Sequence, residues 1–173
     1  MKDFKNNKKF WLTMAYSYKD GYREGVIFLF YKDGRILIEH RPKEDGGIET
    51  FIPNGSIEDK DHGQELDYKL VALHREVYEE FQGKVKVNNC KKISEYKVDE
   101  IKIIFYTYVV DDWDGEIPEY TIEDGEKFAD LELVRLDDFR NYLKLDSAVD
   151  ACLALKNYLV NKDKGDDPKI WDF

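Results

Sequence analysis

Four charged residues lie close together within the segment HREVYEEFQG, residues 74–83. They are Arg75, Glu76, Glu79 and Glu80. On a helix that turns by about 100° per residue, the three glutamates fall within about 100° of one another. Like charges at this spacing destabilise a helix unless something neutralises them. The segment is therefore either the solvated charged face of a helix or a site for a divalent cation, because carboxylate oxygens are the ligands that Mg²⁺ and Mn²⁺ prefer.

The apolar residues of the same helix decide between these interpretations. They form one stripe that must face the core: Leu66, Leu70, Leu73, Val77 and Phe81. Glu80 lies only about 20° from Leu73, so the glutamates are placed at the edge of the buried stripe instead of on the far, solvated face. Unpaired carboxylates in a partly buried position are costly. A bound cation removes that cost, so the pattern favours a Mg²⁺ or Mn²⁺ site.

Two strands and a turn are predicted before this helix. The segment EGVIFLFYKDGRILIEHRP, residues 24–42, has the pattern of a hairpin that turns at Asp33-Gly34. The segment GGIETFIPNGSIE, residues 46–58, reads as a short strand that runs into a Pro-Asn-Gly loop. The helix itself is expected over about residues 62–82, with Asp61 as its N-cap and Gln64 as the reciprocal partner.

The rest of the chain alternates between strand and helix patterns. It predicts strands at 84–98, 101–110 and 131–136, a long acidic loop at 111–130, a short helix at 136–143, an amphipathic helix at 147–160 and a mobile tail at 161–173. Strands interleaved with helices indicate an α/β fold in which helices cover a mixed β-sheet. The length of 173 residues suits a single domain, residues 1–173, with a core of about 22–160.

The segment REVYEE, Arg75 to Glu80, resembles the signature of the Nudix hydrolases, G-x5-E-x7-R-E-U-x-E-E-x-G-U, in which U is an aliphatic residue. FIPNGSIE is similar to the glycine loop that precedes the helix of that family. Gly55 and Arg75 are six residues farther apart than in the signature, and the extra residues fall in EDKDHGQ. This polar insertion, within residues 56–63, is expected to form an exposed loop outside the metal site. Asp67, or Glu65 as a displaced substitute, takes the place of the first glutamate of the signature.

The resemblance implies a Nudix-like α/β/α sandwich with a mixed β-sheet, and a role for each matching residue. Mg²⁺ or Mn²⁺ is expected on Glu79 and Glu80, with Glu76 as a further ligand or as the general base and Arg75 orienting a glutamate. The backbone carbonyl of Gly55 is expected to help. A distal acid is expected from the acidic loop, with Glu126 preferred to Glu123. Arg41, at the end of a predicted strand, is a candidate for substrate phosphate or an ordinary surface arginine.

The activity implied by the resemblance is metal-dependent cleavage of the pyrophosphate bond in a nucleoside diphosphate-linked substrate by an activated water. One alternative is a non-catalytic sensor that binds a nucleotide, although such proteins usually lose part of the R-E-x-x-E-E motif. Another is a diphosphate isomerase on the same fold, which would need a catalytic cysteine near the glycine loop. Cys90 and Cys152 lie elsewhere in the sequence.

The composition of the chain limits the classes of partner that it is expected to bind. A net charge of −10 argues against binding to duplex nucleic acid, which requires a basic face. The apolar runs are too short to cross a membrane, and the first residues show no signal peptide. Cys90 and Cys152 form no disulfide framework, so a reducing cytoplasm is expected. The oligomeric state stays open, with a homodimer as one option.

Overall fold

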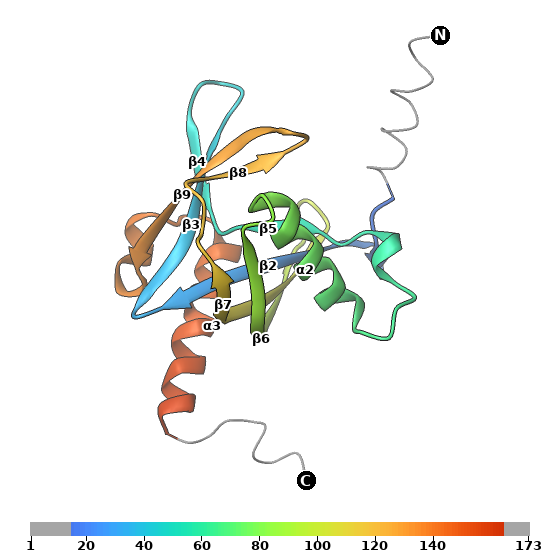
Figure 1. Cartoon of the computed structure of the whole chain (residues 1–173). Helices are drawn as coiled ribbons and strands as arrows, with labels where there is room; N and C mark the ends of the chain where they lie inside the picture. Colours follow the sequence, from blue (N-terminus) through green and yellow to red (C-terminus); the bar gives the residue numbers. More distant parts are fainter. Residues whose placement is uncertain (1–14, 165–173) are drawn as a thin grey trace.

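The computed structural model describes residues 15–164 of the chain (Figure 1). Its strands are β1 (Tyr18–Lys19), β2 (Tyr22–Lys32), β3 (Arg35–Pro42), β4 (Ile48–Phe51), β5 (Asn54–Ser56), β6 (Val85–Val98), β7 (Ile103–Gly115), β8 (Tyr120–Glu123) and β9 (Glu126–Arg135). Its helices are the 3₁₀ helices η1 (Asp59–Asp61) and η2 (Leu136–Asn141) and the α-helices α2 (Tyr68–Glu80) and α3 (Asp146–Asp163). None of these helices is long and apolar enough to cross a bilayer.

The predicted hairpin is confirmed as β2 and β3. The two strands are joined by Asp33 and Gly34, whose φ angles are 53° and 78°. Two consecutive positive φ angles make the tight hairpin turn for which Asp-Gly is a preferred pair. β2 and β3 pair only next to this turn, from Tyr31–Ile36 to Lys32–Arg35. Beyond these pairs the two strands diverge.

The divergence divides the mixed sheet into two parts, which run in the order β6-β7-β2-β3-β9-β8. β7 pairs with β2 in parallel, and the other pairings are antiparallel. β5 adds to the free edge of β2 in antiparallel pairing, with Gly55 opposite Val26. This pairing fixes the glycine loop against the centre of the sheet, and η1 and an irregular segment separate it from α2 in the chain.

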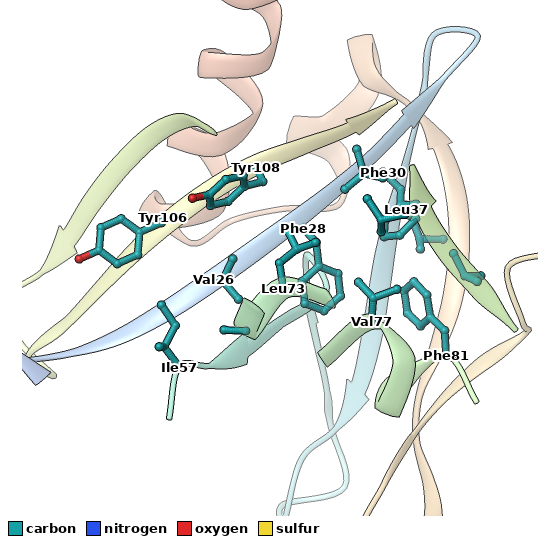
Figure 2. Packing of buried hydrophobic residues seen from close by; sticks show 14 of the residues in the cluster. Val26, Phe28, Phe30, Leu37, Ile57, Leu73, Val77, Phe81, Tyr106 and Tyr108 are labelled. Atoms are coloured by element: carbon teal, nitrogen blue, oxygen red, sulfur yellow. The ribbon is translucent and has the colours of Figure 1, made fainter. Parts of the chain in front are cut away.

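The two faces of β2 bury two separate cores. Val26, Phe28 and Phe30 face α2, whereas Ile27 and Leu29 face α3. Because successive side chains of a strand point to opposite faces, the apolar run from Val26 to Phe30 of β2 supplies both cores. Figure 2 shows Leu73, Val77 and Phe81 of the α2 segment packed toward the first of these faces. The predicted α/β/α sandwich with a mixed sheet is confirmed.

The start of the α2 helix was predicted too early. The helix begins at Tyr68, and its N-cap is Asp67, whose side chain accepts a hydrogen bond of 2.9 Å from the backbone N–H of Lys69. Asp61 instead ends the short 3₁₀ helix η1. Leu66 precedes α2 and is 50% exposed, so it does not belong to the buried stripe. Gly63, with a φ of 85°, lies in the irregular segment that separates η1 from α2.

The rest of the predicted stripe lies in the core. Leu73, Val77 and Phe81 are fully buried, and Leu70 is half-buried against the same core. The stripe therefore orients α2 as expected, and the three glutamates lie beside it.

The acidic segment 111–130 was wrongly predicted to be a loop. Its first residues continue β7 to Gly115, and β8 and β9 form a hairpin that turns at Asp124 and Gly125, with φ angles of 52° and 79°. Asp-Gly again supplies the two positive φ angles that a tight turn requires. The final helix, α3, extends to Asp163, three residues beyond its predicted end. Most of the tail predicted to be mobile, residues 165–173, lies outside the described residues.

Candidate active site

A cavity of about 750 Å³ lies where β5, α2 and the β8–β9 hairpin meet. Its walls are Tyr16, Arg23, Arg41, Asn54, Gly55, Ser56, Glu58, Arg75, Glu76, Glu79, Glu80, Ile122, Glu123, Asp124, Gly125 and Phe128. The three glutamates and the arginine singled out in the sequence are thus brought to one cavity, together with Gly55 and Arg41. The lining is rich in carboxylates and contains three arginines, a composition suited to a cation and phosphoryl groups.

Arg75 is the most heavily bonded side chain of the cavity. Its guanidinium donates two hydrogen bonds to the carboxylate of Asp61, at 2.9 and 2.8 Å, and one of 3.1 Å to the backbone carbonyl of Ser56. It donates a further bond of 2.9 Å to Glu76 and a longer one of 3.4 Å to Glu79. Arg75 therefore fixes three parts of the chain relative to one another. They are the residue that follows the glycine loop, the insertion and helix α2.

Arg75 and the carboxylates around it stabilise one another in their charged forms. Burial acts to lower the pKa of Arg75, but the hydrogen bonds of Asp61 and the charge of Glu76 outweigh it, so the pKa is raised. Burial would likewise raise the pKa of Asp61, yet the hydrogen bond from Arg75 prevails and the pKa is lowered. Both groups are held in their charged forms, as expected for a paired, hydrogen-bonded bridge.

The insertion is largely exposed, as the sequence predicted, but it contains the short helix η1 and one buried carboxylate. Asp61 is 1% exposed and supplies the main partner of Arg75. His62 lies 2.7 Å from the hydroxyl of the buried Ser17, and its ring stacks on Tyr68 with 4.0 Å between the ring centroids. Neither Glu65 nor Asp67 lines the cavity. The role of Asp61 was not predicted from the sequence. The Nudix signature has its first acid at a fixed distance before the arginine, whereas in this chain the longer loop folds back and brings a different acid to Arg75.

Glu76 lies directly against Gly55. A Cβ atom added to Gly55 would stand 2.3 Å from Cδ of Glu76, which is far inside van der Waals contact. Glycine is needed here for this close approach, and the φ of Gly55 is unremarkable. Burial raises the pKa of Glu76 to about 7, against the opposing charge of Arg75 and with a further contribution from the charge of Glu79. Glu76 can therefore exchange a proton near neutral pH.

Glu80 is the carboxylate with the least compensation. Its Oε2 atom is buried and has no hydrogen-bond partner among the described residues. Burial raises the pKa of Glu80 well above its ordinary value, and the nearby charges of Glu76 and Glu39 add to the effect. Glu79 is different, because half of its side chain is exposed and it reaches Arg75 only at 3.4 Å. Helix α2 thus presents two different carboxylates to the cavity. That of Glu80 has an oxygen without a hydrogen-bond partner among the described residues, and that of Glu79 is solvated.

The donor set fits a hard divalent cation. Within residues 15–164 no group of three His, Cys, Asp or Glu side chains already stands in a closed metal-binding arrangement. However, the Oε2 atom of Glu80 has no hydrogen-bond partner among residues 15–164, and burial raises the pKa of Glu76 although Arg75 is bonded to it, so neither carboxylate is fully compensated by the described chain. Carboxylate oxygens next to a backbone carbonyl are the ligands that Mg²⁺ and Mn²⁺ prefer. The residues present therefore suit the ion that the sequence led us to expect.

Arg41 reaches the cavity from β3. Its Nε donates a hydrogen bond of 2.6 Å to Glu39, a carboxylate that is 1% exposed. The guanidinium also lies over the rings of Phe51 and Phe128, at 5.8 and 5.4 Å from the centroids. Burial raises the pKa of Glu39, and the charge of Arg41 opposes this. The sequence analysis missed Glu39, although its position two residues before Arg41 on one strand places both on the same face.

Of the two acids expected from the distal segment, the structure places Glu123 at the cavity and not the preferred Glu126. Glu126 begins β9 and is exposed outside the cavity, whereas Glu123, at the end of β8, lines it. Burial raises the pKa of Glu123, with a contribution from the charge of Asp124. Glu123 and Glu126 are directly opposite partners in the β8–β9 pairing, so the position of this hairpin beside α2, which no local sequence pattern specifies, decides which acid lines the cavity.

Solved structures with a similar fold include proteins described as Nudix hydrolases. The structure of an ADP compounds hydrolase is similar over 83% of this chain and 75% of that chain, with a TM-score of 0.62 and 16% identity. A MutT Nudix hydrolase from Burkholderia pseudomallei matches over 76% and 96%, with a TM-score of 0.59 and 19% identity. The ORF135 protein of E. coli matches over 78% and 88%, with a TM-score of 0.59 and 17% identity.

No protein-family model and no curated protein matches the sequence. At this level of identity, the structural likeness shows the fold, and the chain has the Nudix fold that the sequence resemblance implied.

Proposed function

We propose that this protein is a Nudix-type pyrophosphohydrolase that depends on Mg²⁺ or Mn²⁺ and cleaves the diphosphate bond of a nucleoside diphosphate-linked substrate by attack of water. The observation that carries the proposal is the buried Oε2 of Glu80, which has no partner and lies beside Glu76 in a cavity lined by three arginines. Such an arrangement suits a cation together with the anionic group that the cation binds.

Glu79 and Glu80, with the backbone carbonyl of Gly55, are the residues that would hold the ion, and Glu123 from the β8–β9 hairpin replaces Glu126 as the candidate for a further acid. A divalent ion at this place supplies charge neutralisation for phosphate oxygens and lowers the pKa of a bound water. Arg41 and Arg23, which also line the cavity, are the candidates for contact with the remaining phosphoryl oxygens.

Glu76 is the proposed general base. A general base works best when its pKa is near the working pH, and burial brings the pKa of Glu76 to about 7. Its orientation is fixed from one side by the 2.9 Å hydrogen bond from Arg75 and from the other by contact with Gly55. Arg75 is thus a positioning residue in this proposal, and Asp61 holds Arg75 in turn.

The isomerase alternative finds no support in the described residues. Cys152 is buried in the core on the α3 side, where burial raises the pKa of its thiol to about 12. Cys90 lies on β6, and burial raises its pKa to about 11. Neither thiol lines the cavity or carries the lowered pKa of a reactive cysteine.

The test is a hydrolysis screen in H₂¹⁸O against nucleoside triphosphates, ADP-ribose, dinucleoside polyphosphates and nucleotide sugars, with Mg²⁺, Mn²⁺ or EDTA. We expect metal-dependent cleavage that places ¹⁸O on a phosphoryl product. Glu76→Gln should lower kcat by about two to four orders of magnitude, as for a lost general base. Arg75→Ala should lower kcat more than it raises KM, and Glu65→Gln, outside the cavity, should change neither.

Glu79→Gln should lose activity through weaker metal binding, and added Mg²⁺ should partly restore it. If the purified protein cleaves none of the four substrate classes with either metal, yet binds a nucleotide tightly, the sensor function replaces the hydrolase.

A further inference from the structure

The insertion between the glycine loop and α2 is anchored on both sides of Asp61. Before Asp61, the backbone N–H of Ile57 donates to the carbonyl of Glu24 at 3.0 Å, which ties the segment after β5 to β2. After Asp61 comes His62, the C-cap of η1, whose side chain contacts residues outside the insertion. The acid that bonds to Arg75 therefore lies between two attachment points.

The second attachment point consists of two contacts of His62. Its Nε2 lies 2.7 Å from the hydroxyl of Ser17, a residue that is 2% exposed. Its ring stacks on that of Tyr68, with centroids 4.0 Å apart and planes inclined by 20°. Ser17 directly precedes β1, and Tyr68 is the first residue of α2. His62 thus connects the insertion to two other parts of the chain.

Both partners of His62 bind the same buried carboxylate. Glu24, in β2, is 1% exposed. Its Oε1 accepts a hydrogen bond of 2.7 Å from Ser17, and its Oε2 accepts bonds of 2.5 Å from the hydroxyls of Tyr68 and Tyr106. Burial acts to raise the pKa of Glu24, but the hydrogen bonds from these three hydroxyls outweigh it, so the pKa is lowered. A charged carboxylate therefore holds the partners of His62 in place.

The ring of Tyr106 belongs to β7 and lies on the face of the sheet that packs against α2 (Figure 2). The group formed by Ser17, Glu24, Tyr68 and Tyr106 therefore joins β2, β7, the start of α2 and the chain before β1. We call it the Glu24 network. Buried polar groups that satisfy one another in this way are rigid, so the network is a firm support for the side chain that bonds to it.

The direction of the bond between His62 and Ser17 follows from a count of hydrogens. A hydroxyl has one hydrogen, and that of Ser17 is donated to Glu24. The oxygen of Ser17 must therefore accept from His62, whose Nε2 carries the hydrogen. Neutral imidazole with its hydrogen on Nε2 and the imidazolium form can both donate this bond. The contact is thus a structural link and needs no particular charge on the histidine.

The link matters because the other bonds of Asp61 are local or belong to the site. Its backbone N–H donates to the carbonyl of Glu58 at 3.0 Å, and its carboxylate accepts from the N–H of Glu58 at 2.8 Å. These bonds shape the turn of η1 but do not place it relative to α2. A misplacement of about 1 Å can lower a rate by about a hundredfold. The position of Asp61 against Arg75 therefore depends on the attachment of the turn.

We propose that His62 is a positioning residue of the site, because it attaches the insertion to the Glu24 network and so holds Asp61 against Arg75. His62 does not line the cavity, and it acts on Glu76 only through Asp61 and Arg75. The proposal rests on the proposed function for the reaction that Glu76 supports. It also gives a role to the extra residues that separate this chain from the Nudix signature.

The first test compares kcat and KM of the full chain in Mg²⁺. His62→Ala removes a hydrogen bond and a ring contact, so kcat should fall by about tenfold while KM stays within about twofold. His62→Gln keeps an N–H donor at the end of the side chain and should restore kcat to within about threefold of the unchanged chain. Gln64→Ala, at an exposed position of the same segment, is the matched control and should change neither constant.

The second test needs no hydrolysis. The Nε–H of Arg75 donates to Asp61 at 2.9 Å, so its hydrogen should exchange slowly with water. In ¹⁵N NMR spectra of the full chain in EDTA, this signal is assigned by its loss in Arg75→Lys. We expect exchange to be at least about tenfold faster in His62→Ala and nearly unchanged in His62→Gln and Gln64→Ala. The Nε–H of Arg41, bonded to Glu39, is the internal reference and should not change.

The inference is overturned if the Arg75 signal exchanges at the same rate in His62→Ala, or if the Arg41 signal accelerates equally, which would indicate general loosening. It is also overturned if His62→Gln behaves like His62→Ala in both tests. Faster exchange at Arg75 in a protein that cleaves no substrate would remove the proposed function alone. Cleavage with an unchanged kcat in His62→Ala would remove the positioning role alone.

Discussion

Arg75 joins three parts of the chain at the scale of single residues. It bonds to Asp61 in the insertion, to the carbonyl of Ser56 after the glycine loop and to Glu76 on its own helix. An arginine fork can satisfy such a set because its five N–H donors have a fixed planar geometry. Removal of a partner leaves a charge that is poorly solvated, so each bond has a measurable consequence.

Asp61→Asn tests whether the insertion supports the site. The change removes the charge of a carboxylate that is 1% exposed and leaves Arg75 without its main partner. Breaking a buried ion pair from one side costs about 3 kcal/mol. We expect a loss of that order in the free energy of unfolding, measured by urea denaturation, and a fall in kcat. Asp59→Asn, at an exposed position of the same 3₁₀ helix, is the control. Equal stability of the two variants would contradict the role of Asp61.

Glu76 should make stability depend on pH. Burial raises its pKa from 4.5 to about 7 in the folded protein, so protonation favours folding. The contribution is fully present below pH 4.5 and is lost as the pH rises through about 7. In EDTA we expect the free energy of unfolding to decline across this interval, and Glu76→Gln to decline less. Urea denaturation at several pH values measures it, with Glu65→Gln as control. The same slope in both variants would refute the assignment.

At the scale of the elements, α2 is oriented by its apolar stripe. Its N-cap is a different residue from the one predicted from the sequence. The buried Leu73 and Val77 orient the helix, and Asp67 satisfies the first-turn N–H of Lys69. A cap and a metal ligand make different demands on one carboxylate, because a cap contributes only to stability. The two roles can therefore be separated by experiment.

Asp67→Ala should lower the free energy of unfolding by about 1 kcal/mol, the usual cost of a lost N-cap. The kcat of hydrolysis should stay unchanged, because Asp67 does not line the cavity. Thermal denaturation and steady-state kinetics measure the two effects, with the exposed Glu65→Ala as the neighbouring control. A loss of activity without a loss of stability would show that Asp67 acts in the site after all.

The β8–β9 hairpin should contribute one acid and not the other. Glu123 lines the cavity and Glu126, three residues later, does not. Glu123→Gln should weaken Mn²⁺ binding by about tenfold or more, as measured by calorimetry. Glu126→Gln should leave it within about twofold. The reverse order would restore Glu126 as the acid and place the register of this hairpin in question.

At the scale of the whole molecule, the charge of −10 and the cavity carboxylates act in the same direction. A folded chain that gathers Glu76, Glu79 and Glu80 at one cavity is destabilised by their repulsion, whereas the unfolded chain separates them. A cation that binds only the folded state stabilises it by mass action, by about 2.7 kcal/mol at a concentration of 100 times Kd.

Mg²⁺ should therefore raise the melting temperature more than NaCl of equal ionic strength. We expect the difference in a thermal shift measurement to shrink in Glu79→Gln and in Glu80→Gln. Glu65→Gln, outside the cavity, should keep the full shift. Identical shifts in all four proteins would indicate general screening instead of a specific ion.

The sequence by itself determined the features that depend on local spacing. The Asp33-Gly34 pair specifies the tight turn between β2 and β3, and the apolar stripe orients α2. The placement of Glu76, Glu79 and Glu80 beside the stripe follows from helical geometry alone. These inferences succeed because each rests on residues within a few positions of one another.

Only the tertiary structure decided which distant residues complete the site. Asp61 faces Arg75 because the insertion folds back, and Glu123 lines the cavity because the β8–β9 hairpin lies beside α2. Loop paths and strand register depend on contacts between elements that are separated by many residues, and no local pattern encodes them.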